Sequence, residues 1–150
     1  MRGLRGGRYS YRPSHGHRSG LEDNIAAQIK AQGCVEVYEQ RQIQYIIPAS
    51  EHIYTPDFIL PNGIIIEAKG LFELSDRKKH LLIKDQYPHL DIRFVFQNPK
   101  HKLYKGSTTT YADWCNKHGF EYAAKLIPAS WFKARKKDTT GLIAKTKKEK

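Results

Sequence analysis

Cysteine is scarce in this chain, and long apolar runs are missing altogether. The two cysteines, Cys34 and Cys115, lie far apart and outside any C-x-x-C motif, which excludes a disulfide framework and a cysteine zinc site. No stretch approaches the roughly 18 consecutive apolar residues of a membrane-spanning helix, and the N-terminal residues lack the apolar core of a secretory signal. We therefore expect a soluble, cytoplasmic protein whose cysteines are reduced and pack in the fold.

Acidic residues are absent from the first twenty positions, and this absence shows where the positive charge lies. That segment carries five arginines, residues 133–150 carry eight basic and two acidic residues, and the net charge of +11 lies entirely in these two ends. Basic ends around a neutral body favour a polyanionic partner, because each neutralised phosphate releases counterions. Solvated ends that only aid solubility would have the same composition. We expect a basic arm at 1–18, one domain at 19–133 and a basic tail at 134–150.

The apolar periodicity of the central part predicts a mixed α/β domain, with a central sheet flanked by helices. The predicted helices cover residues 19–32, 75–86 with Ser75 as N-cap, and 110–118. The predicted strands cover residues 34–39, 42–47, 53–60, 63–69 and 91–96, and a last apolar segment covers 126–132. We expect 34–39 to pair with 42–47, and 53–60 to form a hairpin with 63–69.

The turn of the second hairpin decides which polar residues meet. If Pro61-Asn62-Gly63 is a three-residue loop, counting back along both strands places Asp57 directly opposite Glu67, with Cβ atoms ~5 Å apart. Lys69 then projects from the same face as Glu67, because side chains alternate along a strand. A two-residue turn would instead place Phe58 opposite Glu67.

Asp57, Glu67 and Lys69 therefore form a candidate catalytic group. Two facing carboxylates repel unless a cation lies between them, and Mg²⁺ binds through one or two carboxylates, waters and phosphate. With Lys69 to neutralise developing charge, this is chemistry for hydrolysing a phosphodiester. The ordinary alternative is a turn aspartate and an exposed ion pair of little energetic weight. The apolar residues around them oppose it, since strands that are buried on both faces make unpaired charges costly.

Glu22 permits two interpretations. Ser19-Gly20-Leu21-Glu22 matches the S-x-x-E capping box, in which Ser19 and Glu22 satisfy each other's backbone amides. From the residues alone the capping role is favoured, and only a family resemblance makes Glu22 a catalytic candidate.

The chain resembles the family of bacteriophage T-seven endonuclease I across residues 18–133. The matching segments are Arg18 to Asp23, Tyr45 to Phe58, Leu60 to Ile64, Glu67, Lys69 to Leu71, Asp76 to Ile83, Leu103 to Ser107 and Lys125 to Ala129. Ala68 departs from the family pattern, which has threonine there. This change lies on the opposite face of the strand from Glu67 and Lys69.

This resemblance implies a restriction-endonuclease-like core and a Mg²⁺-dependent enzyme, with Mn²⁺ as a substitute and one or two ions per site. It implies paired nicks in four-way and other branched DNA, in the host-cell cytoplasm. It also implies an intertwined homodimer whose sites combine Glu22 of one chain with Asp57, Glu67 and Lys69 of the other, all four being catalytic and the three acids metal ligands. Segment exchange is physically cheap at a proline-containing link such as residues 47–51.

The basic residues offer further candidates for contact with DNA. Those that we favour are Arg77, Lys78 and Lys79, with Lys105 second; a solvated helix face is the alternative. His80 is expected to pack or cap, and His15 and His17 to have no role. Two rival functions remain open: a nuclease of linear duplex, and a basic nucleic-acid-binding protein without catalysis.

Overall fold

The computed structural model describes residues 17–47 and 50–145, so most of the N-terminal arm and the last five residues of the tail lie outside the described residues. The helices are α1 (Gly20–Ala31), α2 (Leu74–Gln86), α3 (Tyr111–His118) and α4 (Ala129–Phe132). The strands are β1 (Arg41–Ile47), β2 (Ser50–Tyr54), β3 (Phe58–Ile59), β4 (Ile65–Lys69), β5 (Ile92–Phe96), β6 (Tyr122–Ala124) and β7 (Leu142–Ala144). No described helix is long and apolar enough to cross a bilayer.

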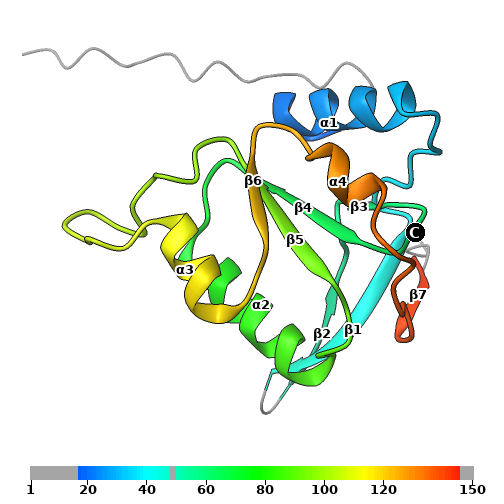
Figure 1. Ribbon diagram of the computed structural model, residues 1–150. Coiled ribbons are helices and arrows are strands. Elements are labelled where there is room, and N and C mark those ends of the chain that lie inside the picture. Colours follow the sequence, from blue (N-terminus) through cyan, green and yellow to red (C-terminus); the bar gives the residue numbers. More distant parts are fainter. Residues whose placement is uncertain (1–16, 48–49, 146–150) are drawn as a thin grey trace, which may run out of the picture.

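The strands form two sheets, with helices on both sides of the larger one. The smaller sheet has the order β2-β1-β7 and is antiparallel. The larger has the order β3-β4-β5-β6, in which β3 is antiparallel to β4 while β4, β5 and β6 are parallel. Figure 1 shows α2 and α3 on one side of this sheet and α1 and α4 on the other. The prediction of an α/β domain with a mixed sheet between helices is confirmed.

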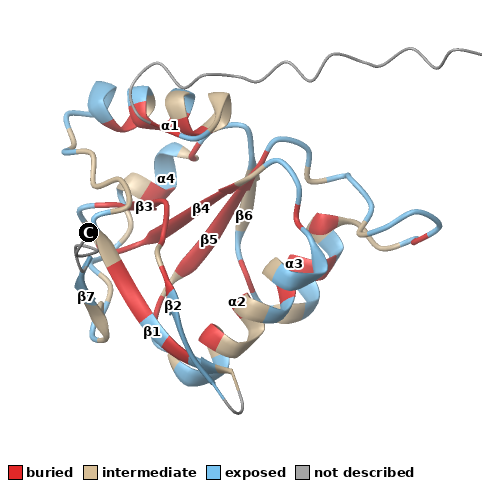
Figure 2. Ribbon diagram, turned by 180° about the vertical axis from the view of Figure 1, so that it is seen from behind, coloured by how far each residue is buried: buried red, intermediate tan, exposed pale blue. Residues whose placement is uncertain are grey.

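The larger sheet is buried on both faces. Every residue of β5 is buried, and Figure 2 shows the same for most of β4. Because successive side chains point to opposite faces, Ile65 packs in the core beneath α2 and α3, and Ile66 packs in the core beneath α1 and α4. The side chains of Glu67 and Lys69 lie at every second position after Ile65 and therefore point to the same face of β4 as Ile65.

The hairpin has the register of the three-residue loop. Phe58 pairs with Ile66 and Ile59 with Ile65, and the Leu60 N–H donates to the Ile64 carbonyl at 2.8 Å. The prediction of a three-residue loop is therefore confirmed, and the alternative register with a two-residue turn is wrong. Gly63 has a φ of 88°, a conformation that a residue with a Cβ adopts only with strain.

The predicted strand 53–60 is broken in the middle. Residues up to Tyr54 belong to β2 and pair with β1, whereas Phe58 and Ile59 pair with β4 in the other sheet. Pro56 lies at the break, where it has no N–H to donate to a ladder. The chain passes from the smaller sheet to the larger sheet here. This crossover places Asp57 directly before the first residue of β3.

The prediction of a strand at 34–39 is wrong. Only an isolated bridge between Tyr38 and Phe58 forms there, and Val35 is 77% exposed. Glu39 has a φ of 48°, which breaks the extended path immediately before β1. As a result, β1 pairs with β2 and β7 instead.

Three other elements differ from the sequence prediction. No strand was predicted in the basic tail at 134–150, but β7 lies in it and pairs with β1. Strand β6 was not predicted, and within 126–132 only α4 is regular. Helix α2 begins at Leu74 with Glu73 as N-cap instead of Ser75, because the Asp76 carboxylate accepts the Glu73 N–H. Helices α1 and α3 agree with their predictions within about one residue.

Candidate active site

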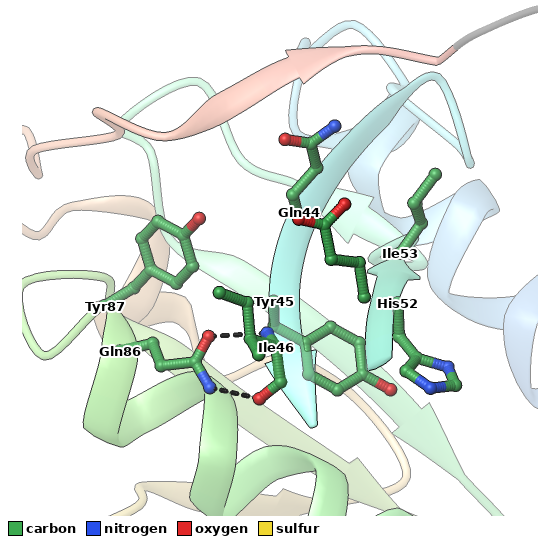
Figure 3. A pocket seen from close by; sticks show the side chains of 8 residues that line it. Gln44, Tyr45, Ile46, His52, Ile53, Gln86 and Tyr87 are labelled. Carbon is green, nitrogen blue, oxygen red and sulfur yellow. Dashed lines mark hydrogen bonds between the residues drawn. The ribbon is translucent and has the colours of Figure 1, made fainter. Parts of the chain in front are cut away.

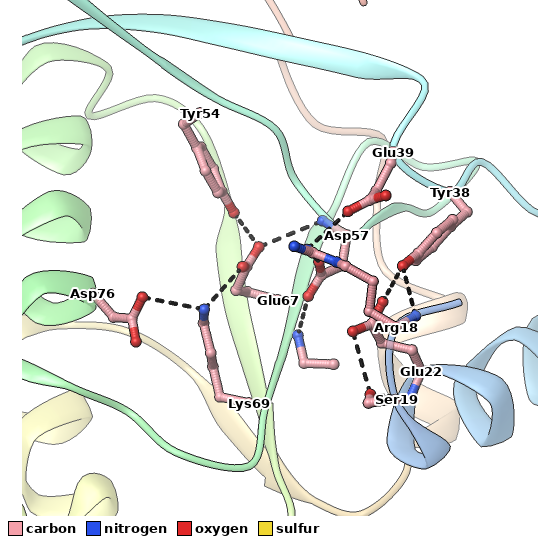
Figure 4. Close-up of polar contacts among 11 residues, drawn as sticks. Arg18, Ser19, Glu22, Tyr38, Glu39, Tyr54, Asp57, Glu67, Lys69 and Asp76 are labelled. Atoms are coloured by element: carbon pink, nitrogen blue, oxygen red, sulfur yellow. Dashed lines mark hydrogen bonds and ion pairs between the residues drawn. The ribbon is translucent and has the colours of Figure 1, made fainter. Parts of the chain in front are cut away.

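Asp57 and Glu67 meet at the end of the hairpin. They are 2% and 3% exposed, and the Asp57 N–H donates to Glu67 Oε2 at 3.4 Å. Asp57 Oδ2 accepts the Ala68 N–H at 2.9 Å, and Glu67 Oε2 accepts the Tyr54 hydroxyl (Figure 4). The hairpin register thus brings the two carboxylates together, as expected from the sequence, and a backbone N–H group donates to each of them.

The electrostatics of this pair are unfavourable without a cation. The pKa of Asp57 is raised to about 8, first by burial and then by the negative charges of Glu67 and Glu22. Burial also raises the pKa of Glu67, although Lys69 and the Tyr54 hydroxyl oppose the shift. Strongly perturbed carboxyl groups at the rim of a cleft are typical of functional sites.

The raised pKa of Asp57 has a measurable consequence for stability. Between 3.8 and about 8, the folded protein keeps a proton on Asp57 that the unfolded chain releases, so rising pH destabilises the fold and the full cost is reached above the folded pKa. We expect Asp57→Asn, assayed with chelator, to raise Tm by roughly 3–6 °C at pH 9 and to leave it unchanged near pH 4. Differential scanning calorimetry measures both values. A variant that melts below the wild type at pH 9 would contradict the assignment.

Lys69 lies beside the carboxylates and keeps its proton. Its Nζ is 3.5 Å from Glu67 Oε1 and 3.3 Å from Asp76 Oδ1. Burial lowers the pKa of Lys69, but the charges of Glu67, Asp76 and Asp57 outweigh it and raise the pKa above its ordinary value. Lys69 can therefore supply positive charge or donate a hydrogen bond, and it is poorly suited to accept a proton.

Glu22 is buried at the start of α1, and its carboxylate does not close a capping box. The Ser19 hydroxyl accepts the Glu22 N–H, but the Glu22 carboxylate accepts from the Ser19 and Tyr38 hydroxyls, not from the Ser19 N–H. Its charge is close enough to raise the pKa of Asp57. The structure therefore places Glu22 near Asp57 within one chain, although among the described residues Glu22, Asp57 and Glu67 do not gather around one point.

The sequence did not predict a cluster of polar contacts close to Glu22, formed by His17, Asp23, Glu36 and Tyr38. His17, expected to have no role, is buried, bonds Asp23 and Glu36, and lies edge-on to the Tyr38 ring. Burial lowers the pKa of His17, but its hydrogen bonds to the two carboxylates outweigh burial and raise the pKa above the ordinary value. An isolated histidine in a glycine-rich segment gives no sign of such partners, which come from α1 and from the loop before β1.

The predicted DNA contacts differ in their exposure. Arg77 is buried, and its guanidinium donates to the carbonyls of Phe72 at 2.7 Å and Leu103 at 3.5 Å. Arg77 therefore stabilises the fold through these backbone contacts, and we do not assign it a contact with DNA. Lys78 and Lys105 are exposed, and Lys79 lies over the Tyr54 ring at the cleft. The contacts of these three lysines with DNA stay predictions.

His80 behaves as expected. It is fully buried, it packs edge-on against Tyr54 and Phe94, and burial lowers its pKa well below the ordinary value. Cys34 and Cys115 are both free, as expected.

A polar cleft of about 540 Å³ opens beside the carboxylates. The residues that line it are Arg18, Glu39, Ile53, Tyr54, Thr55, Glu67, Lys69, Asp76, Lys79 and Lys145. A separate hollow of about 350 Å³ lies between the β1–β2 pair and the end of α2 (Figure 3). There the Gln86 amide bonds the N–H and carbonyl of Ile46, which anchors β1 to α2.

The residues present suit a hard divalent cation. Among residues 17–47 and 50–145, no three acidic, histidine or cysteine side chains gather around one point. Magnesium requires fewer protein ligands, because it keeps several waters and completes its shell with phosphate oxygens. Asp57 and Glu67 would hold it, because a cation would offset the burial that raises the pKa of both groups and the repulsion from Glu67 that raises the pKa of Asp57.

Buried carboxylates beside a protonated lysine, at the rim of a polar cleft in a mixed α/β domain, are suited to an enzyme that cleaves phosphodiester bonds. The sequence model of the phage endonuclease I family matches residues 6–150, and the chain belongs to this family. It is 57% identical over 121 residues to endonuclease I of Escherichia phage T7, which is 81% of each chain. It is 53% identical over 144 residues to endodeoxyribonuclease 1 of Enterobacteria phage T3, which is 95% of each chain. The prediction of an endonuclease is thus confirmed.

Proposed function

We propose that this endonuclease cleaves DNA in a Mg²⁺-dependent reaction and is selective for four-way junctions and other branched DNA, in which it makes paired nicks. The observation that carries the proposal is the buried pair Asp57 and Glu67, facing each other across the hairpin with Lys69 beside them. Membership of the phage endonuclease I family supports it, and the relative from phage T3 is named an endodeoxyribonuclease. Phage origin would place the reaction in the host cytoplasm.

Within this proposal, Asp57 and Glu67 hold one or two ions per site, with Glu22 as a further ligand. Bound Mg²⁺, or Mn²⁺ in its place, supplies Lewis-acid polarisation of the phosphate and a more acidic water. Tyr54 keeps one oxygen of Glu67 in place, and the backbone of Ala68 does the same for Asp57. Carboxylates whose orientation is already set need little reorganisation when they act.

Lys69 acts by its charge. Its ammonium is held between Glu67 and Asp76, and it can donate a hydrogen bond to a phosphate oxygen in the cleft. Lys79 lies on the same cleft and adds positive potential, while the basic ends of the chain contribute attraction without sequence preference.

A homodimer with exchanged segments belongs to the same proposal. The chain passes from β1 to β2 through Pro48 and Ala49, which lie outside the described residues. An exchange at this link would carry α1, Glu22 and β1 into the partner's domain with their contacts preserved, including the Gln86 anchor. Two coupled sites could then cut two strands of one junction before release.

Cleavage of a labelled four-way junction, beside its matched linear duplex, tests the proposal. With Mg²⁺ we expect the junction to be nicked in two strands at a rate on the order of 10²-fold above that of the duplex, and with chelator we expect no cleavage. Equal rates on both substrates would show a duplex nuclease. Tight junction binding without cleavage would show a binding protein.

A further inference from the structure

Arg18 places a guanidinium against the candidate metal ligands. Its Nη2 lies 2.8 Å from Glu39 Oε1 and 3.4 Å from Asp57 Oδ1 (Figure 4). The Asp57 side chain is 3% exposed, whereas that of Arg18 is 68% exposed at the wall of the cleft. The ionised form of Asp57 thus has a positively charged partner that is itself accessible to solvent.

Neighbouring residues fix the backbone of Arg18 in place, whereas its guanidinium stays accessible to solvent. The Arg18 N–H donates to the Tyr38 hydroxyl at 3.2 Å, and the preceding residue, His17, is buried. The Glu39 N–H donates to the Asp57 carbonyl at 3.1 Å, so a backbone hydrogen bond holds the two acidic partners of Arg18 side by side. Only the long side chain of Arg18 must move for the contact to break.

The two oxygens of Asp57 have different partners. Oδ2 accepts the Ala68 N–H at 2.9 Å, and Oδ1 faces Arg18. Oδ1 is the oxygen without a backbone donor and is the natural ligand for a cation. A guanidinium at this oxygen and a metal ion bound to it would compete for the same charge, because two cations so close together repel.

We propose that Arg18 is an internal counter-ion of Asp57 that a divalent cation must displace. The proposal rests on the metal role of Asp57 in the proposed function. It makes Arg18 a positioning residue that stabilises the ionised form of Asp57 in the metal-free site. Displacement leaves an arginine at the cleft, where its planar fork of donors suits a phosphate group.

A link between metal and nucleic acid follows from this competition. An anion that binds the guanidinium draws Arg18 away from Asp57 and so favours metal binding. By thermodynamic reciprocity, bound metal then favours the anion to the same degree. Arg18 is the last residue of the basic arm, so DNA phosphates that engage this segment would favour loading of the site.

Isothermal titration of DNA-free protein with Mn²⁺ tests the proposal. We expect Arg18→Ala to bind Mn²⁺ about two- to fivefold more tightly than the wild type, the range expected for losing one partly exposed ion pair. Arg18→Gln removes the charge with less loss of volume and should give the same gain. Arg135→Ala removes an exposed arginine outside the cleft lining and should leave the affinity unchanged, whereas Asp57→Asn should abolish tight binding.

The outcomes separate this role from the proposed function. If the wild type cleaves junctions with Mg²⁺ but both Arg18 variants, folded by circular dichroism, bind Mn²⁺ no more tightly, the counter-ion role is overturned alone. A gain of the same size in Arg135→Ala would also overturn it, since only the net charge would then matter. A wild type that neither binds the metal nor cleaves would overturn both proposals.

Discussion

Asp57→Asn is expected to abolish cleavage of a four-way junction, lowering the rate by on the order of 10³-fold or more, while junction binding persists. Asparagine keeps the shape of the side chain and can still accept the Ala68 N–H that holds Asp57 in place. It removes the negative charge that, together with Glu67, makes the site attractive to a cation. Single-turnover cleavage and a gel-shift assay in Ca²⁺ measure the two properties separately.

Asp85→Asn provides the matched control for this substitution. Asp85 is an exposed aspartate on α2, and the same change of charge there should leave both cleavage and binding as in the wild type. Binding should be unchanged or tighter in Asp57→Asn, because one negative charge near the DNA is removed. Undiminished cleavage by this variant would remove Asp57 from the chemistry and leave the binding-protein interpretation.

Mixing two inactive chains is expected to restore activity. If sites are shared between protomers, a heterodimer of Glu22→Gln and Asp57→Asn has one site with both lesions and one site with none. Random reassociation after unfolding produces heterodimers as about half of all dimers, so about one quarter of the wild-type sites should return. The product should be a single nick in each junction, because only one site per heterodimer is intact. Supercoiled cruciform plasmid reports single nicks as open circles and paired nicks as linear DNA.

The contacts of Glu22 explain why this pairing of variants is informative. Its carboxylate accepts from the Tyr38 hydroxyl, and its charge raises the pKa of Asp57, so Glu22 lies near Asp57 in the structure. Mixing the folded variants without unfolding is the control, and it should restore nothing if exchange requires opening of the dimer. Co-refolded mixtures that stay as inactive as the single variants would favour sites built within one chain.

The hairpin shows how much of the site could be predicted from local sequence. The Pro61-Asn62-Gly63 turn determines the register, and the register with strand alternation brings Asp57, Glu67 and Lys69 to one face. These are relations over about ten residues, and turn chemistry and the two-residue period of strands are sufficient to fix them. Helices α1 and α3 were predictable for the same reason, since their caps and apolar periodicity are local.

The sheets were harder to predict because strand pairing depends on distant partners. Residues 34–39 have β-forming side chains, yet Glu39 at positive φ and competition from β7 leave them outside any strand. The residues of β7 lie in a lysine-rich tail with few apolar neighbours, so only their position beside β1 makes them a strand.

The sequence by itself determined the hairpin, the candidate catalytic group Asp57, Glu67 and Lys69, the basic ends and, through its family, the class of enzyme. Only the tertiary structure decided that Arg77 is buried against backbone carbonyls, that His17 pairs with two carboxylates, and that Arg18 faces Asp57. The physical reason is that burial and charge pairing are properties of side chains brought together from distant segments. A local pattern specifies which side chains share a face, whereas the packing of α1 and of the loop before β1 specifies what they meet there.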